Sequence, residues 1–176
     1  MIRRYGWRTA IAAVLTGALV LTVSQVIAGG NTTATGGRSE AIKVRRGPDA
    51  TTTTSTTFVD VPSSAVTLSV PSGRRALFVA RFFAESQCSQ AGTDGDWCGI
   101  RIRTGATPLQ PDSDFAFDST NNGAESDASW ESHATERSIV LGPGNYTFTV
   151  QYRTTEADTT FRVDDWSFSV ERFFKS

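Results

Sequence analysis

From about residue 56 onward, apolar and polar residues alternate with a period of two over several short segments. The two clearest segments flank the cysteines. The residues that share the mostly apolar parity are Phe78, Ala80, Phe82, Ala84, Ser86 and Cys88 in the first segment, then Cys98, Ile100 and Ile102 in the second. Period-two alternation is the pattern of a β-strand with one buried face. Both segments are therefore predicted to be half-buried strands, with Arg101 and Arg103 on the other face of the second.

About eight such segments follow one another, and turn-forming residues separate them. The separators are Pro62, Pro71-Ser72-Gly73, Asn121-Asn122-Gly123 and Gly142-Pro143-Gly144-Asn145. No segment shows a sustained helical period. This pattern predicts an all-β domain closed as a two-sheet antiparallel sandwich. A jelly roll is favoured because its two Greek keys use eight strands. An immunoglobulin-like sandwich is the alternative, although the chain lacks the long-range Cys…Trp…Cys spacing of that fold.

Strand parity also predicts the core between the two sheets. The residues expected there are Phe78, Phe82, Ile100, Phe148, Val150, Tyr152, Trp166 and Phe168. Trp130 is expected to pack with them.

Two segments near the end of the chain carry a family resemblance. LGPGNYTFTVQYR, from Leu141 to Arg153, and FRVDDWSFSVER, from Phe161 to Arg172, resemble the closing hairpin of secreted jelly-roll modules. These modules include the globular heads of complement and tumour-necrosis-factor type and many carbohydrate-binding modules. The stretch from Thr56 to Phe174 also resembles β-sandwich proteins secreted by actinobacteria. The resemblance implies a fold rather than a site, because one fold hosts many functions.

The N-terminal segment has the architecture of a secretory signal peptide. Arg3, Arg4 and Arg8 precede an apolar run from about Ala10 to Val23, and small residues end at Ala28. The run is short for a bilayer, which needs roughly 20 residues, so cleavage after Ala28 is predicted rather than a retained anchor. We therefore expect a signal peptide at 1–28, a flexible Gly/Thr-rich spacer at 29–54 and a β-sandwich domain at 55–176. The expected location is extracellular or at the cell surface.

Removal of the signal peptide changes the charge of the chain. It takes three of the 17 basic residues and none of the 18 acidic ones, which leaves a net charge of about −4. A mildly acidic chain lacks the basic footprint of nucleic-acid binding. We expect no nucleic-acid partner and no membrane association after cleavage.

Cys88 and Cys98 are the two cysteines of the chain. In an oxidising compartment two cysteines of a small domain usually pair, and nine intervening residues exclude a Cys-x-x-Cys redox motif. With a single histidine in the chain, a Cys/His zinc site would need carboxylate ligands. Both cysteines lie on the apolar parity, so a disulfide is predicted to close a hairpin between the two flanking strands.

Trp97 lies out of phase with Cys98 and Ile100, in a polar loop that contains Asp94 and Asp96. An exposed tryptophan there would form a platform for a sugar ring, with the two carboxylates accepting hydrogen bonds from hydroxyls. The alternative is a tryptophan folded back over the disulfide. The three residues are the candidate binding site.

His133 is the single histidine, and Glu131 shares its strand parity. A glutamate two residues away can orient an imidazole, which makes the pair a fragment of a Ser-His-acid site. The nucleophile motif G-x-S-x-G is absent. A polar pair without a catalytic role is the simpler interpretation.

Acidic residues cluster between Thr104 and Glu136, where no Lys or Arg occurs. They are Asp112, Asp114, Asp118, Glu125, Asp127 and Glu131. Closely spaced carboxylates in loops are what calcium needs, although the EF-hand pattern is not met. Solvated acidic loops that protect strand edges explain the cluster equally. We expect no cofactor, with calcium as the alternative.

Three functions follow for testing. The first is a secreted, non-catalytic binding or cell-surface module whose end loops bind a polysaccharide or cell-surface glycan. The second is a secreted hydrolase that uses Glu131, His133 and nearby acids. The third is a structural envelope or assembly protein. The first is favoured because the sequence contains no nucleophile or metal constellation.

Overall fold

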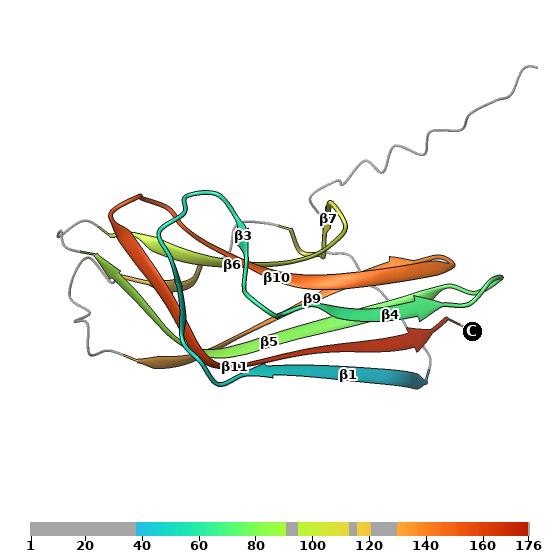
Figure 1. The fold of residues 1–176 in the computed structure, drawn as a ribbon. Coiled ribbons are helices and arrows are strands. Elements are labelled where there is room, and N and C mark those ends of the chain that lie inside the picture. Colours follow the sequence, from blue (N-terminus) through green and yellow to red (C-terminus); the bar gives the residue numbers. More distant parts are fainter. Residues whose placement is uncertain (1–37, 91–94, 113–115, 121–129, 176) are drawn as a thin grey trace, which may run out of the picture. The chain divides into compact units, whose positions relative to one another are not determined.

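The computed structural model describes residues 38–90, 95–112, 116–120 and 130–175. These residues form eleven strands joined by turns. No helix long and apolar enough to cross a membrane is found within the described ranges. The strands form two antiparallel sheets, seen in Figure 1 as two layers, with β6 and β10 in one layer and β1, β5 and β11 in the other.

The first sheet has β11 and β5 at its centre. Its strand order is β1 (Ser39–Gly47), β11 (Thr159–Phe174), β5 (Ala76–Gln90) and β9 (Glu131–Leu141). The short strand β2 (Thr51–Thr53) follows β1 along the same edge of β11. One long edge of β11 thus carries two consecutive segments of the chain.

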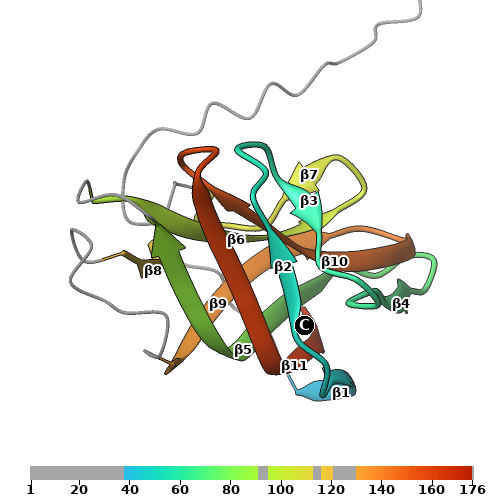
Figure 2. The same cartoon turned by 60° about the vertical axis from the view of Figure 1, so that its left-hand side comes forward.

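The second sheet is built around β10 and β6. One edge of β10 (Gly144–Thr154) carries β3 (Val59–Asp60) and β4 (Val66–Val70), and the other edge pairs with β6 (Trp97–Thr104). The free edge of β6 carries β7 (Thr107–Pro108) and β8 (Ala116–Ser119). Figure 2 shows β3 beside β10 from a second direction.

The strand order is that of a jelly roll. β1 and β2 share one edge of β11, β3 and β4 share one edge of β10, and β7 and β8 share one edge of β6, so each of these pairs counts as one strand position. Numbered along the chain, the eight positions that result have the order 1-8-3-6 in the first sheet and 2-7-4-5 in the second. This is the arrangement of two Greek keys wound into a sandwich. The predicted all-β, two-sheet sandwich and its favoured topology are confirmed.

The core lies between the two sheets, on the parity that the sequence predicts. All eight predicted core residues are buried: Phe78, Phe82, Ile100, Phe148, Val150, Tyr152, Trp166 and Phe168. Phe78 and Phe148, from opposite sheets, have ring centroids 4.9 Å apart. The aromatic rings therefore join the two sheets as well as filling each face.

Trp130 is the exception to the core prediction. It is 37% exposed, and the guanidinium carbon of Arg162 lies 4.8 Å from its ring centroid. The strand register explains the error. His133 pairs with the buried Ala84 and faces the same way as the core, so Trp130, of the other parity, points outward.

The Cys88–Cys98 disulfide is present, but the hairpin predicted around it is wrong. Cys88 belongs to β5 in the first sheet and Cys98 to β6 in the second. Both cysteines face inward, where the inner faces of the sheets meet, and their Cα atoms are 5.8 Å apart. The bond therefore crosslinks the two sheets and does not close the mouth of a hairpin.

The predicted spacer does not extend to residue 54. β1 pairs with β11 from Ser39 to Gly47, and β2 continues the pairing to Thr53. Segments with little apolar periodicity can form edge strands, because main-chain hydrogen bonds to one neighbour suffice. The sandwich thus begins at or before Ser39. The predicted signal peptide and residues 29–37 of the predicted spacer lie outside the described residues.

Candidate functional site

Trp97 is the first residue of β6, and its indole is exposed. It is 55% accessible to solvent, whereas the next residue, Cys98, is fully buried. Strand alternation therefore turns Trp97 outward. Of the two alternatives that the sequence leaves open, the structure shows the exposed one.

The main chain of Trp97 is held from both sides. Its N–H donates to Thr155 Oγ1 at 3.0 Å, and its carbonyl accepts from the Thr155 N–H at 3.0 Å. On the other edge Trp97 pairs with Ser119 of β8. The indole thus stands on a strand whose position is fixed, which lowers the conformational entropy that a ligand must remove.

Asp96 does not join Trp97 at the surface. It is buried, and its carboxylate accepts hydrogen bonds from the hydroxyls of Thr159 and, at 3.4 Å, Thr155. Its main chain exchanges two bonds with Thr120. Asp96 thus anchors the start of β6, and we leave it out of the proposed site. Asp94 and most of its loop lie outside the described residues.

Around Trp97, the outward side chains of β6, β10 and β3 form one surface, here called the Trp97 face. In addition to Trp97, its members are Asp60, Arg101, Arg103, Gln151 and Arg153, together with Phe58, which directly precedes β3. Arg153 pairs with Gly99, and Gln151 pairs with Arg101. Since cross-strand and diagonal neighbours lie roughly 5–8 Å apart, Arg153 is beside both Trp97 and Arg101.

Phe58, just before β3, supports two of the arginines. The guanidinium carbon of Arg101 lies 4.2 Å from the Phe58 ring centroid, and that of Arg153 lies 4.8 Å from it. A guanidinium at this range is attracted by the ring's π electrons. The two positive charges are therefore held on one half-buried aromatic ring.

A hydrogen-bonded line runs across three strands of the face. Arg101 donates through Nε and Nη2 to Gln151 Oε1, at 3.1 and 2.6 Å, and Gln151 Nε2 donates to Asp60 Oδ1 at 2.7 Å. Arg103 completes the line with 3.0 Å bonds to both oxygens of Asp60. The donor on one side and the acceptor on the other determine the orientation of the buried Gln151 amide.

The charges of the line shift the pKa of Asp60. Burial raises this pKa, but the hydrogen bonds from Arg103 and Gln151 and the charge of Arg103 together lower it below its ordinary value. The line thus keeps Asp60 ionised and keeps Arg101 in one orientation.

His133 and Glu131 lie in a separate cluster with Ser86 and Asp118. Ser86 Oγ donates to Asp118 Oδ2 at 2.6 Å and lies 2.9 Å from His133 Nδ1. Glu131 Oε2 is 3.4 Å from His133 Nε2. The pairing of His133 with an acid was predicted, but Ser86 and Asp118 come from β5 and β8, distant in the sequence.

The cluster does not have the hydrogen-bond arrangement of a catalytic triad. A hydroxyl has one proton, and Ser86 gives it to Asp118, so His133 Nδ1 must donate to Ser86 rather than remove its proton. Ser86 is also only 1% exposed, which keeps a substrate from its oxygen. The cluster ties β5, β8 and β9 together, and we do not propose hydrolysis there.

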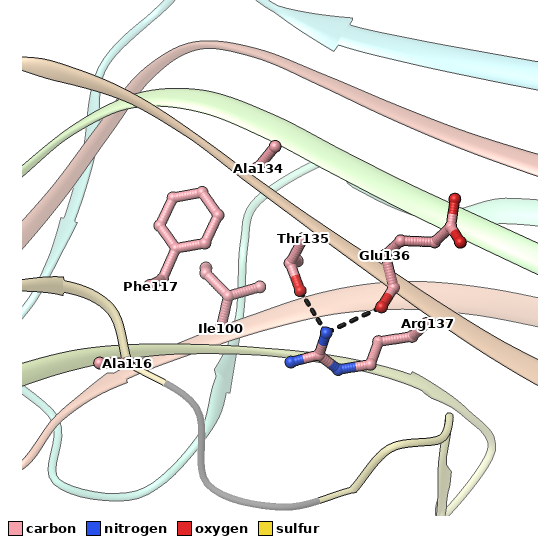
Figure 3. Close-up of a pocket in the computed structure, with 7 residues that line it drawn as sticks. All are labelled: Ile100, Ala116, Phe117, Ala134, Thr135, Glu136 and Arg137. Atoms are coloured by element: carbon pink, nitrogen blue, oxygen red, sulfur yellow. Dashed lines mark hydrogen bonds between the residues drawn. The ribbon is translucent and has the colours of Figure 1, made fainter. Parts of the chain in front are cut away.

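A pocket of about 250 Å³ opens beside this cluster, between β9 and the second sheet. Figure 3 shows the Arg137 guanidinium bonded to the Thr135 hydroxyl and to the main-chain oxygen of Glu136, with Phe117 and Ile100 on the other side of the pocket. Burial lowers the pKa of Arg137. Because its own strand engages the guanidinium, we assign no ligand to this pocket.

Within the described ranges, no group of three or more His, Cys, Asp or Glu side chains is placed to hold a metal ion. Asp118 is engaged by Ser86 and by the Ser119 N–H. Asp114, Glu125 and Asp127 lie outside the described residues. No cofactor is indicated by the arrangement.

Comparisons with known proteins do not identify a family for this chain. No family model and no curated protein matches the sequence. Three solved structures share some of its arrangement. Dimeric latent PorU from Porphyromonas gingivalis has a TM-score of 0.37 and 11% sequence identity, and the match covers 83% of this chain and 14% of the PorU chain. The C-terminal CBM6 of LamC, a marine laminarinase from Zobellia galactanivorans, has a TM-score of 0.30 and 13% identity over 73% of this chain and 98% of that chain. Infectious bursal disease virus Gx strain has a TM-score of 0.30 and 10% identity over 81% of this chain and 39% of that chain. The chain thus spans a small part of the PorU chain. At these TM-scores the similarities carry no argument about function.

Proposed function

We propose that the protein is a non-catalytic module that binds a glycan on the Trp97 face. The exposed indole of Trp97, on a strand held at both edges, is the observation that carries the proposal. A sugar ring has an apolar side that stacks on an aromatic ring and hydroxyls that pair with polar groups around it. Arg101 and Arg153 are polar groups of that kind.

The rigidity of the face supports the same proposal. Gln151 orients Arg101, and Phe58 supports both Arg101 and Arg153. Side chains held in place before binding lose less entropy when a ligand arrives. The site that we propose thus differs from the one expected from the sequence: it lies on the outer surface of the second sheet and not in the end loop.

The test compares Trp97→Ala with Trp130→Ala, a matched control. Trp130 is also an exposed tryptophan but lies on Arg162, away from the face. Isothermal titration against a panel of neutral and acidic cell-wall polysaccharides should show at least a tenfold loss of affinity for Trp97→Ala, about 1.4 kcal/mol, and no loss for Trp130→Ala. Equal losses or none would remove Trp97 from the site, and a wild type that binds no member of the panel would reject glycan binding.

We also propose that the protein is secreted, on the signal-peptide pattern of residues 1–28. Sequencing the N-terminus of exported protein should find Gly29. An intact Met1 on the exported chain would contradict cleavage. The role of an envelope or assembly protein stays a prediction.

A further inference from the structure

We infer that the glycan of the Trp97 face is acidic and that Arg101 and Arg153 bind its anionic groups. This inference rests on the proposed function, because it names the chemical class of the same ligand. It concerns the charge of the face, whereas the proposed function concerns the indole.

The first argument is the spacing of two like charges. The guanidinium carbons of Arg101 and Arg153 lie 4.2 and 4.8 Å from one ring centroid, so they are at most about 9 Å apart. Two positive charges at this distance repel each other by about 0.5 kcal/mol in water. An anionic group within reach of both guanidiniums would be attracted by both charges.

The second argument is the charge balance of the four strands β3, β4, β6 and β10, all of which the structure describes. They contain three arginines, Arg101, Arg103 and Arg153, and one acidic residue, Asp60. Asp60 is bonded to Arg103 and Gln151. The whole chain, in contrast, has a net charge of −1. These four strands therefore carry a net charge of +2, on the sheet that carries the exposed tryptophan.

The third argument is the availability of donors on Arg101. A guanidinium has five N–H donors, and the bonds to Gln151 use Nε and one hydrogen of Nη2. Nη1 and the second hydrogen of Nη2 can still pair with a carboxylate or sulfate, and a planar guanidinium matches such groups in a two-bond geometry. The carboxylate of Asp96 does not compete, because it faces Thr159 away from the surface.

The test measures binding of four polysaccharides by isothermal titration: polygalacturonate, its methyl ester, dextran sulfate and unsubstituted dextran. Each acidic member has a neutral counterpart with the same backbone. Wild type should bind one or both acidic members at least tenfold more tightly than the neutral counterpart. The affinity should also fall as NaCl rises from about 0.05 to 0.5 M, because salt screens exposed charges. Preference for the galacturonate or for the sulfate identifies the anionic group.

Variants locate the effect on the face. Arg101→Gln/Arg153→Gln should reduce acidic binding at least tenfold, while Arg46→Gln/Arg75→Gln, which removes the same charge at two exposed positions elsewhere, should not. Near-ultraviolet circular dichroism checks that each variant is folded. Arg101→Lys/Arg153→Lys keeps both positive charges but loses the planar two-bond geometry. If this variant binds acidic polysaccharides more tightly than the double-glutamine variant and less tightly than the wild type, charge and geometry both contribute to the affinity, as the proposal expects.

Two results would overturn the inference in different ways. Binding that depends on Trp97 but favours neutral polysaccharides, or is equal for both double-glutamine variants, would reject the acidic ligand and keep glycan binding. No binding to any acidic or neutral polysaccharide would reject both proposals.

Discussion

The disulfide between the two sheets gives a prediction that can be measured without a mutation. Cys88 and Cys98 are ten positions apart. In the chain-entropy description, a crosslink over a loop of that length removes disorder from the unfolded chain worth about 2.7 kcal/mol at 25 °C. Reduction leaves both thiols in place, so the free-energy difference between oxidised and reduced protein reports the crosslink itself.

The assay is urea unfolding of the oxidised and the reduced protein, followed by circular dichroism. With a slope typical of small proteins, the midpoint should fall by roughly 1–3 M urea on reduction. Equal midpoints would refute the entropy argument, and a loss well above about 5 kcal/mol would show that native contacts depend on the bond. Folded reduced protein should retain ligand binding, because Thr155 and β8 still hold the main chain of Trp97.

Two further predictions concern the core and the face. Phe148→Ala should destabilise the protein by about 3–5 kcal/mol, since the ring is fully buried against Phe78; a thermal melt like that of the wild type would contradict this packing. The folded pKa of Asp60 lies below its ordinary value of 3.8, so its contribution to stability should be present above about pH 4 and be lost as pH falls through the folded pKa. Asp60→Asn should lack this component of acid sensitivity in melts at about pH 7 and pH 2, and the same decline in both proteins would contradict it.

The core could be predicted from the sequence because strand parity is a local signal. Phe148, Val150 and Tyr152 alternate with polar residues within one strand, and a strand with one buried face satisfies that alternation. Parity does not identify the partner strand. Cys88 and Cys98 were correctly placed on inward faces, but two sheets have inward faces that meet, so the same pattern fits a hairpin and an inter-sheet bond.

Of the residues in the proposed site, the sequence singled out only Trp97, whose phase against Cys98 predicts its exposure. From the sequence, Asp96 was expected to be exposed like Trp97. A buried carboxylate can be recognised only from the groups that donate hydrogen bonds to it, and these groups, on Thr155 and Thr159, are about 60 positions away in the chain. Arg101, Arg153 and Phe58 were missed for the same reason. Arg101 and Arg153 come together through the pairing of β6 with β10, which no short segment encodes. The available signal was the outward parity of Arg101 and Arg153 on two strands.

The position of the disulfide has a mechanical consequence for the proposed binding on the Trp97 face. Cys98 follows Trp97 directly, and Cys88 lies in β5, which pairs with both β11 and β9. A pull on a ligand stacked on Trp97 would reach β5 through a covalent bond next to the point of attachment. The force would then be distributed over the hydrogen bonds that join β5 to β11 and to β9 in the opposite sheet. It would not act only on the bonds between β6 and β10, which could otherwise break one after another.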